Sequence, residues 1–176
     1  MATKGIKGLT IEGFKDFYKN MDLTTEEILK AAIKGTRITA LNIAGEAQRI
    51  CPRETGTLAR SIVVTKGGLP SNSEEIYQNA KHNSEVINKA EKEGKEIDPS
   101  ELKSIVGKAK SGIPTIFSIS ANTPYALRQH EDGSLKHKEG QQAKYLEIPF
   151  NRIVEQSFES NINNEIYKAM RRKHKS

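Results

Sequence analysis

The chain lacks tryptophan, contains a single cysteine and has no long hydrophobic run among its 176 residues. Cys51 alone cannot form an intramolecular disulfide and has no second thiolate with which to build a zinc site. No stretch approaches the ~20 apolar residues that a membrane-spanning helix needs. The first residues also lack the apolar core of a signal peptide. We therefore expect synthesis in a reducing cytoplasm and no membrane partner.

Charge and hydrophobic content are modest. Hydrophobic residues make up 35% of the chain, a value typical of one domain with thinly packed parts. The formal net charge is +6, with basic residues gathered at the C-terminus in Arg171, Arg172, Lys173 and Lys175. These residues are candidates for facing DNA phosphates, or they form a solvated tail. Aromatic residues do not alternate with them, as they do in proteins that bind single strands.

A long amphipathic helix is predicted near the N-terminus. Thr24 can cap its free N–H groups, and Glu27 can complete a capping box. Pro52 ends the pattern. Residues at three- and four-residue steps form its apolar stripe: Leu29, Ala32, Thr36, Ala40, Ile43, Ala47 and Ile50.

The rest of the chain predicts an α+β fold, as a single domain over residues 1–176. A long N-terminal and a C-terminal helix pack on a small, mainly antiparallel sheet. Residues 1–22 are expected to form an arm. Within it, residues 5–13 are a loop or a β-like segment, and residues 14–20 form a short helix. Residues 58–65 form a strand or begin as a helical turn, and residues 113–120 form a strand.

Residues 71–112 are rich in Glu, Lys, Asn and Ser and predict an inserted, projecting helical hairpin. Its second helix begins at Asp98 and runs to about Ala109. A basic tail covers residues 171–176. The expected core consists of Leu29, Ile43, Ile50, Phe117, Leu146, Phe150 and Ile153.

No pattern of catalytic residues stands out. The nearest approach to a metal cluster is His130, Glu131, Asp132 and His137, whose spacing lacks the helical geometry of a zinc-protease site. Cys51 lies at a helix end that disfavours a thiolate. Ser61 has no histidine partner fixed by spacing. We expect no catalytic residue, no cofactor and no metal, although a metal-dependent nuclease or hydrolase using the His130–His137 region stays an alternative.

Two groups of residues carry a longer signature. The first reads proline, then Thr-Gly-x-Leu-x-x-Ser-Ile, at Pro52, Thr55, Gly56, Leu58, Ser61 and Ile62. The second reads Tyr-Ala followed by a His-Glu pair and then Ala-Lys-Tyr-Leu, at Tyr125, Ala126, His130, Glu131, Lys144, Tyr145 and Leu146. These thirteen residues are called the motif residues below.

Their order and spacing resemble a family of tailed-bacteriophage neck and tail-component proteins, also described as tail-completion, minor capsid or head–tail connector proteins. The resemblance spans about residues 24–170 without the 71–112 insert. It implies a structural virion protein that forms a homo-oligomeric ring, commonly of six, around the DNA channel. The implied partners are portal-side or head–tail adaptor proteins, tail terminator or tail tube proteins, and non-specific DNA. The alternative hypothesis is a nucleic-acid-binding regulatory protein.

Overall fold

The computed structural model describes residues 23–109 and 115–173. Its elements are α2 (Thr25–Ile50), α3 (Thr57–Arg60), β1 (Ile62–Lys66), α4 (Ser73–Glu93), the 3-10 turn η1 (Pro99–Glu101), β2 (Phe117–Ala121), α5 (Ala126–Glu131) and α6 (Glu147–Lys173). β1 and β2 form a two-stranded antiparallel sheet. The predicted α+β class, with two long helices and a small antiparallel sheet, is confirmed. The predicted arm, the short helix at 14–20 and Lys175 lie outside the described residues.

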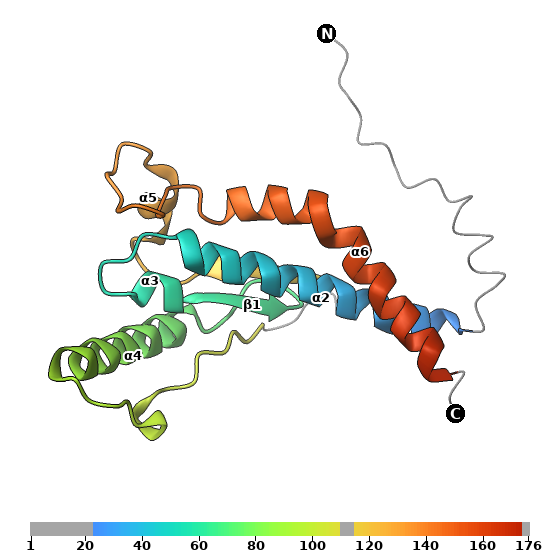
Figure 1. Cartoon of the computed structure of the whole chain (residues 1–176), viewed down its shortest axis with the longest axis horizontal. Coiled ribbons are helices and arrows are strands. Elements are labelled where there is room, and N and C mark those ends of the chain that lie inside the picture. Colours follow the sequence, from blue (N-terminus) through green and yellow to red (C-terminus); the bar gives the residue numbers. More distant parts are fainter. Residues whose placement is uncertain (1–22, 110–114, 174–176) are drawn as a thin grey trace, which may run out of the picture.

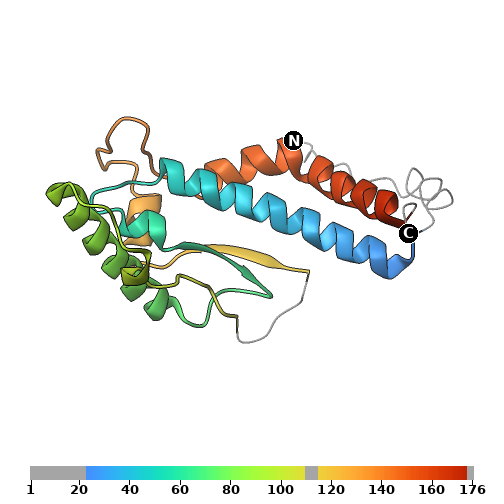
Figure 2. The ribbon, with the colours of Figure 1, turned by 60° about the horizontal axis from the view of Figure 1, so that its bottom comes forward.

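Helix α2 is the central element. Figures 1 and 2 show it lying between α6 on one side and the sheet with α4 on the other. Figure 1 also shows that α6 bends near its middle. Within α6, Ser157 Oγ donates to the Ile153 C=O at 3.0 Å, a side-chain bond of the kind that bends helices.

The start of α2 follows the prediction. Thr24 Oγ1 accepts the Glu27 N–H at 3.2 Å, and the Thr24 N–H donates to Glu27 Oε2 at 2.7 Å. Both halves of the capping box are present. The helix ends at Ile50, before Pro52, as the sequence predicts.

A seam of small residues lets α2 and α6 pack closely. Gly35 is buried, and a Cβ placed on it would lie 2.6 Å from Ile162 Cα and 2.8 Å from the Asn161 C=O oxygen. Next to it, Asn161 Nδ2 donates to Thr39 Oγ1 at 3.0 Å. Only glycine leaves room for the α6 backbone at this crossing.

Ion pairs join the same two helices on either side of the crossing. Arg152 on α6 contacts Glu46 Oε1 on α2 at 2.5 Å, and Lys34 contacts Glu165 Oε2 at 2.6 Å. Hydrogen bonds from Arg49 and Arg152 lower the pKa of Glu46 to about 2. Hydrogen bonds from Lys168 and Lys34 likewise lower the pKa of Glu165, so both carboxylates are ionised near neutral pH and tie α6 to α2 at two places.

The inserted segment differs from the predicted hairpin. α4 forms, but residues 98–109 contain only η1 and then run extended. Asparagine side chains of the α4 region form hydrogen bonds with backbone N–H and C=O groups that a second helix would have paired with one another. Asn83 donates to the Lys103 C=O at 2.9 Å and accepts the Lys103 N–H at 2.8 Å. Asn72 and Asn79 bond in the same way to Val106, Lys108 and Ser104. The predicted second helix is wrong for this reason.

Helix α4 of the insert packs on α3. Arg60 Nη1 donates to Ser84 Oγ at 3.2 Å, and Asn88 Nδ2 donates to the Thr55 C=O at 3.1 Å. Ile76 and Ala80 are fully buried on α4.

The predicted burial is wrong for two of the expected core residues. Leu29 is 50% exposed and Phe150 is 51% exposed. The buried seam of the first half of α2 runs through Ile28, Ala31 and Gly35, one position away from the predicted stripe. The apolar pattern omitted glycine, and glycine is the residue on which α6 packs. Ile43 and Ile50 are buried as predicted, while Phe117, Leu146 and Ile153 are half-buried.

The Gly35 crossing is tested by two glycine-to-alanine variants in one helix. Gly35→Ala should destabilise the fold by at least about 1–3 kcal/mol, because the new methyl group meets the α6 backbone. Gly45 is exposed on α2, and a methyl group added there would meet nothing within 4 Å, so Gly45→Ala should raise stability by about 0.5–1 kcal/mol. Urea unfolding measures both. Equal effects at the two positions would contradict the close crossing.

The corrected core is tested by two truncations. Ile43→Ala should cost about 2–4 kcal/mol, since Ile43 is 3% exposed. Phe150→Ala should cost much less, because half of the ring already faces solvent. Thermal unfolding compares the two variants, and a larger loss for Phe150→Ala would overturn this assignment.

Candidate functional site

The motif residues come together at the C-terminal end of α2, although some lie more than sixty positions apart. Leu58, Ile62, Ala126 and Tyr145 belong to one hydrophobic cluster, and Leu146 packs against it. The α2 residues Ala44, Ala47 and Ile50 complete the same cluster. The two halves of the signature therefore form one packed unit.

Ser61 holds the two strands in register at one end of the sheet. Its buried Oγ donates to the Leu58 C=O at 2.8 Å and accepts the Asn122 N–H at 3.2 Å. Asn122 Nδ2 in turn donates to the Ser61 C=O at 2.8 Å. The hydroxyl is occupied by backbone groups, which is a structural role. Asn122 was missed in the sequence, where it resembles an ordinary turn residue.

Cys51 is fully buried in the same cluster. Burial raises the pKa of its thiol to about 11, against a smaller opposing effect of Arg53. A thiol with this pKa is almost entirely protonated near neutral pH and is a poor nucleophile.

The loop entering α6 carries a charged network. Lys144 Nζ pairs with Glu131 Oε2 and lies 3.2 Å from Glu147 Oε2, while His130 Nδ1 bonds to Glu131 Oε1 at 2.7 Å. Hydrogen bonds from Lys144 and His130 lower the pKa of Glu131. Lys144 has φ of 55°, in the left-handed region that costs a non-glycine residue about 1–2 kcal/mol. Its N–H donates to the His130 C=O at 2.8 Å, which holds that conformation.

Tyr145 links this loop to α5. It is fully buried, its hydroxyl donates to the Ala126 C=O at 3.0 Å, and its ring lies edge-on to His130 at 4.9 Å. Burial raises its pKa well above the usual tyrosine value. Five motif residues from two parts of the chain are thus fixed by direct contacts.

The outer side of this unit is a groove of about 590 Å³. The motif residues Pro52, Thr55, Gly56, Leu58 and Tyr125 line one part of it. Polar side chains line the rest: Arg53, Glu54, Gln129, Lys136, His137, Lys138 and Gln141. Gly56 has φ of 83° and starts α3, which explains why glycine stands there.

Two of the candidate metal residues, Glu131 and Asp132, are engaged in local contacts, whereas the buried Nε2 atoms of His130 and His137 have no partner among the described residues. Asp132 Oδ1 accepts the Ser134 hydroxyl at 2.5 Å and the Ser134 N–H at 3.0 Å, and these two bonds lower the pKa of Asp132. Glu131 belongs to the Lys144 network. Within residues 23–109 and 115–173, no group of three or more His, Cys, Asp or Glu side chains is placed to hold a metal ion.

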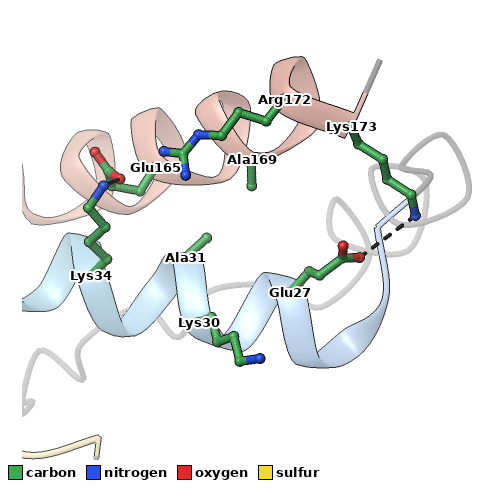
Figure 3. Close-up of a pocket in the computed structure, with 8 residues that line it drawn as sticks. All are labelled: Glu27, Lys30, Ala31, Lys34, Glu165, Ala169, Arg172 and Lys173. Atoms are coloured by element: carbon green, nitrogen blue, oxygen red, sulfur yellow. Dashed lines mark ion pairs between the residues drawn. The ribbon is translucent and has the colours of Figure 1, made fainter. Parts of the chain in front are cut away.

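The basic residues of the tail lie where the C-terminal end of α6 meets the N-terminal end of α2. Figure 3 shows Arg172 extending along the groove between the helices and Lys173 reaching across to Glu27. The Lys173–Glu27 distance is 3.7 Å. The groove also contains Lys30, Lys34 and Glu165, and the lysines pair with glutamates there. Arg171 follows Met170 in the last turn and is exposed.

Two interactions that organise this end of the molecule were not predicted. Glu165 is 3% exposed and pairs with both Lys34 and Lys168 at 2.6 Å. Its pattern in the sequence is that of a surface residue, because nothing there places two lysines beside it. Gly35 in a helical pattern was the one visible sign of a close helix crossing.

Comparison with known proteins gives no match: no protein-family model, curated protein or solved structure is similar to this chain. Among the helices that the structure describes, none is long and apolar enough to cross a membrane.

Tyr145→Phe tests the motif unit without changing its shape. Removing the hydroxyl leaves the buried Ala126 C=O without this donor, which should cost about 1–2 kcal/mol. Chemical unfolding measures the change, and hydrogen exchange should rise in α5 before it rises in α2. An unchanged midpoint would show that the bond contributes nothing to the unit.

Proposed function

We propose that this chain is a structural subunit of a tailed-phage or phage-like particle. It assembles into a ring, most simply of six copies, at the head–tail junction, and acts as a neck or tail-completion adaptor around the DNA channel. Its partners are portal-side or head–tail adaptor proteins on one face and tail terminator or tail tube proteins on the other. The proposal includes no catalytic role.

The observation that carries the proposal is the packing of both halves of the family signature into one unit. The residues of the signature are used for packing and backbone bonding rather than for chemistry, as with Ser61 and Tyr145, and the neighbouring Cys51 is buried and protonated. A signature whose residues build a framework is what a structural subunit needs. It is not what a nucleophile or metal site needs.

Exposed apolar side chains give independent support. Leu41 is 48% exposed, Ile116 46%, Leu127 74%, Phe150 51% and Tyr167 51%. These large side chains lie on α2, α5, α6 and beside β2, and single exposed residues of this kind are common. Phe150, however, lines one apolar pocket together with the half-buried Phe117 and Leu146. Together they form an apolar area of the kind that subunit contacts cover.

The basic residues at the C-terminal end of α6 support the proposal that the ring surrounds DNA. Arg171 and Arg172 carry charge in the last turn of α6, and Arg172 lines one groove with Lys30 and Lys34 of α2. Phosphate attraction without base recognition requires only such exposed cations. The acidic partners of the lysines reduce the field, which suits weak contact with DNA that must slide.

Mass photometry of the full chain tests this function, alone and with purified connector or tail proteins. We expect a discrete species at a multiple of the 19.6 kDa chain mass, six times that mass for the simplest ring. A protein that stays monomeric alone and with both classes of partner would contradict the proposal.

The same experiment with short duplex DNA separates the alternative function. A monomer that binds duplex at micromolar concentration, with affinity falling steeply as salt rises, would favour a nucleic-acid-binding regulator. Substituting Arg171 and Arg172 by glutamine should then abolish the binding. In the ring proposal the same substitutions leave assembly unchanged.

A further inference from the structure

The sheet has one edge whose backbone groups point outward. The Gly67 N–H donates to the Ile116 C=O at 2.8 Å, which makes this a hydrogen-bonded pair of the antiparallel ladder. Because such pairs alternate, Ser118 and Ser120 bond to β1. The N–H and C=O groups of Phe117, Ile119 and Ala121 therefore face away from β1. No other described strand pairs with them.

This edge lacks the features that normally block strand addition. β2 has the sequence Phe-Ser-Ile-Ser-Ala, without charge or proline. The β1 side is different. β1 ends in Lys66, and the extended segment around Gly107 lies so close to it that a Cβ on Gly107 would collide with Thr65 Oγ1. Among residues 23–109 and 115–173, one side of the sheet is covered and no strand pairs with the β2 edge.

An apolar pocket of about 340 Å³ lies beside the open edge. It is lined by β2 and not by β1. Its walls are Ile43 of α2, Phe117 and Ile119 of β2, His130 of α5, and Leu146, Glu147 and Phe150 at the start of α6. Phe117 and Ile119 thus offer side chains to the pocket and backbone groups to the edge. His130 Nε2, in the same wall, is buried with no partner among the described residues.

We infer that this edge and pocket accept a β-strand formed by residues 7–12 of a second copy of the chain. The inference rests on the proposed function and names the contact that joins neighbouring subunits. Residues 7–12 read Lys-Gly-Leu-Thr-Ile-Glu, in which Leu9 and Ile11 alternate with Gly8, Thr10 and Glu12. On a strand, Leu9 and Ile11 share one face and fill the pocket, while the backbone pairs with β2.

The length of the arm favours a neighbouring copy over the same chain. Thr25 and Ile43 are 18 helical residues apart, roughly 27 Å along α2. Residues 11–23 reach at most roughly 40 Å when fully extended, and less in any other conformation. Leu23 packs on the cluster of Ile28 and Ile166, on the α6 side of α2. The arm of the same chain would have to pass around α2 to reach the β2 edge.

Two pairs of matched variants test the contact in the full chain. Ile11→Pro removes an N–H from the strand and should raise the Kd of self-association at least about tenfold, equivalent to about 1.4 kcal/mol. Ala2→Pro, outside residues 7–12, should leave the Kd unchanged. Phe150→Glu at the pocket should weaken assembly in the same way. Phe158→Glu, on the same helix and 37% exposed, should not. Thermal unfolding shows that all four variants remain folded.

Disulfide trapping identifies the donor copy. Mixed Ile11→Cys and Ile119→Cys proteins should give a covalent dimer under mild oxidation, whereas either variant mixed with wild type should not. Crosslinking only within the double variant at high dilution would mean that the arm covers its own sheet, which overturns the inference. Normal rings from Ile11→Pro, without crosslinking, would also overturn it while the proposed function stands. A wild-type chain that never assembles would remove the proposed function itself.

Discussion

The close crossing of α2 and α6 at Gly35 is the constraint on which the rest of the structure depends. The α6 backbone lies where a side chain on residue 35 would be, and the ion pairs Glu46–Arg152 and Lys34–Glu165 hold the two helices on either side. Because α6 occupies this face of α2, the sheet and α4 are left with the opposite face (Figure 2). The two helices form a rigid support, and the functional segments are arranged around its ends.

One end of this support carries the motif residues and the other carries the basic end of α6. At the C-terminal end of α2, Tyr145 and Ser61 tie α5, the sheet and the entry to α6 into one unit. At the N-terminal end, Arg172 and Lys173 of α6 lie against α2. In a ring built from such subunits, one surface contacts the neighbouring copies and a different surface contacts DNA, as the proposed adaptor requires.

The sequence predicted those helices and strands that are determined by interactions between residues close together in the chain. The Thr24 capping box and Pro52 define both ends of α2, and the β-branched runs located the two strands. Prediction failed where a residue distant in the sequence determines the conformation or the burial of a segment. Residues 98–109 have a good helix start, but Asn83 bonds to the Lys103 backbone and keeps the segment extended. Leu29 fits the apolar period, yet the α6 crossing at Gly35 turns it to solvent. Of the candidate site, the motif residues were predicted, while Asn122 and Glu165 depend on contacts that no spacing reveals.

The central claim is that this chain is an assembly subunit whose neighbours meet at an open sheet edge. Electron cryomicroscopy of the full chain, assembled alone or on its connector, tests the claim most directly. The account predicts a closed ring with α2 and α6 along its wall and a third strand from the adjacent copy beside β2. A ring whose contacts leave the β2 edge in solvent would contradict the proposed interface. Particles showing only single chains would contradict the assembly function.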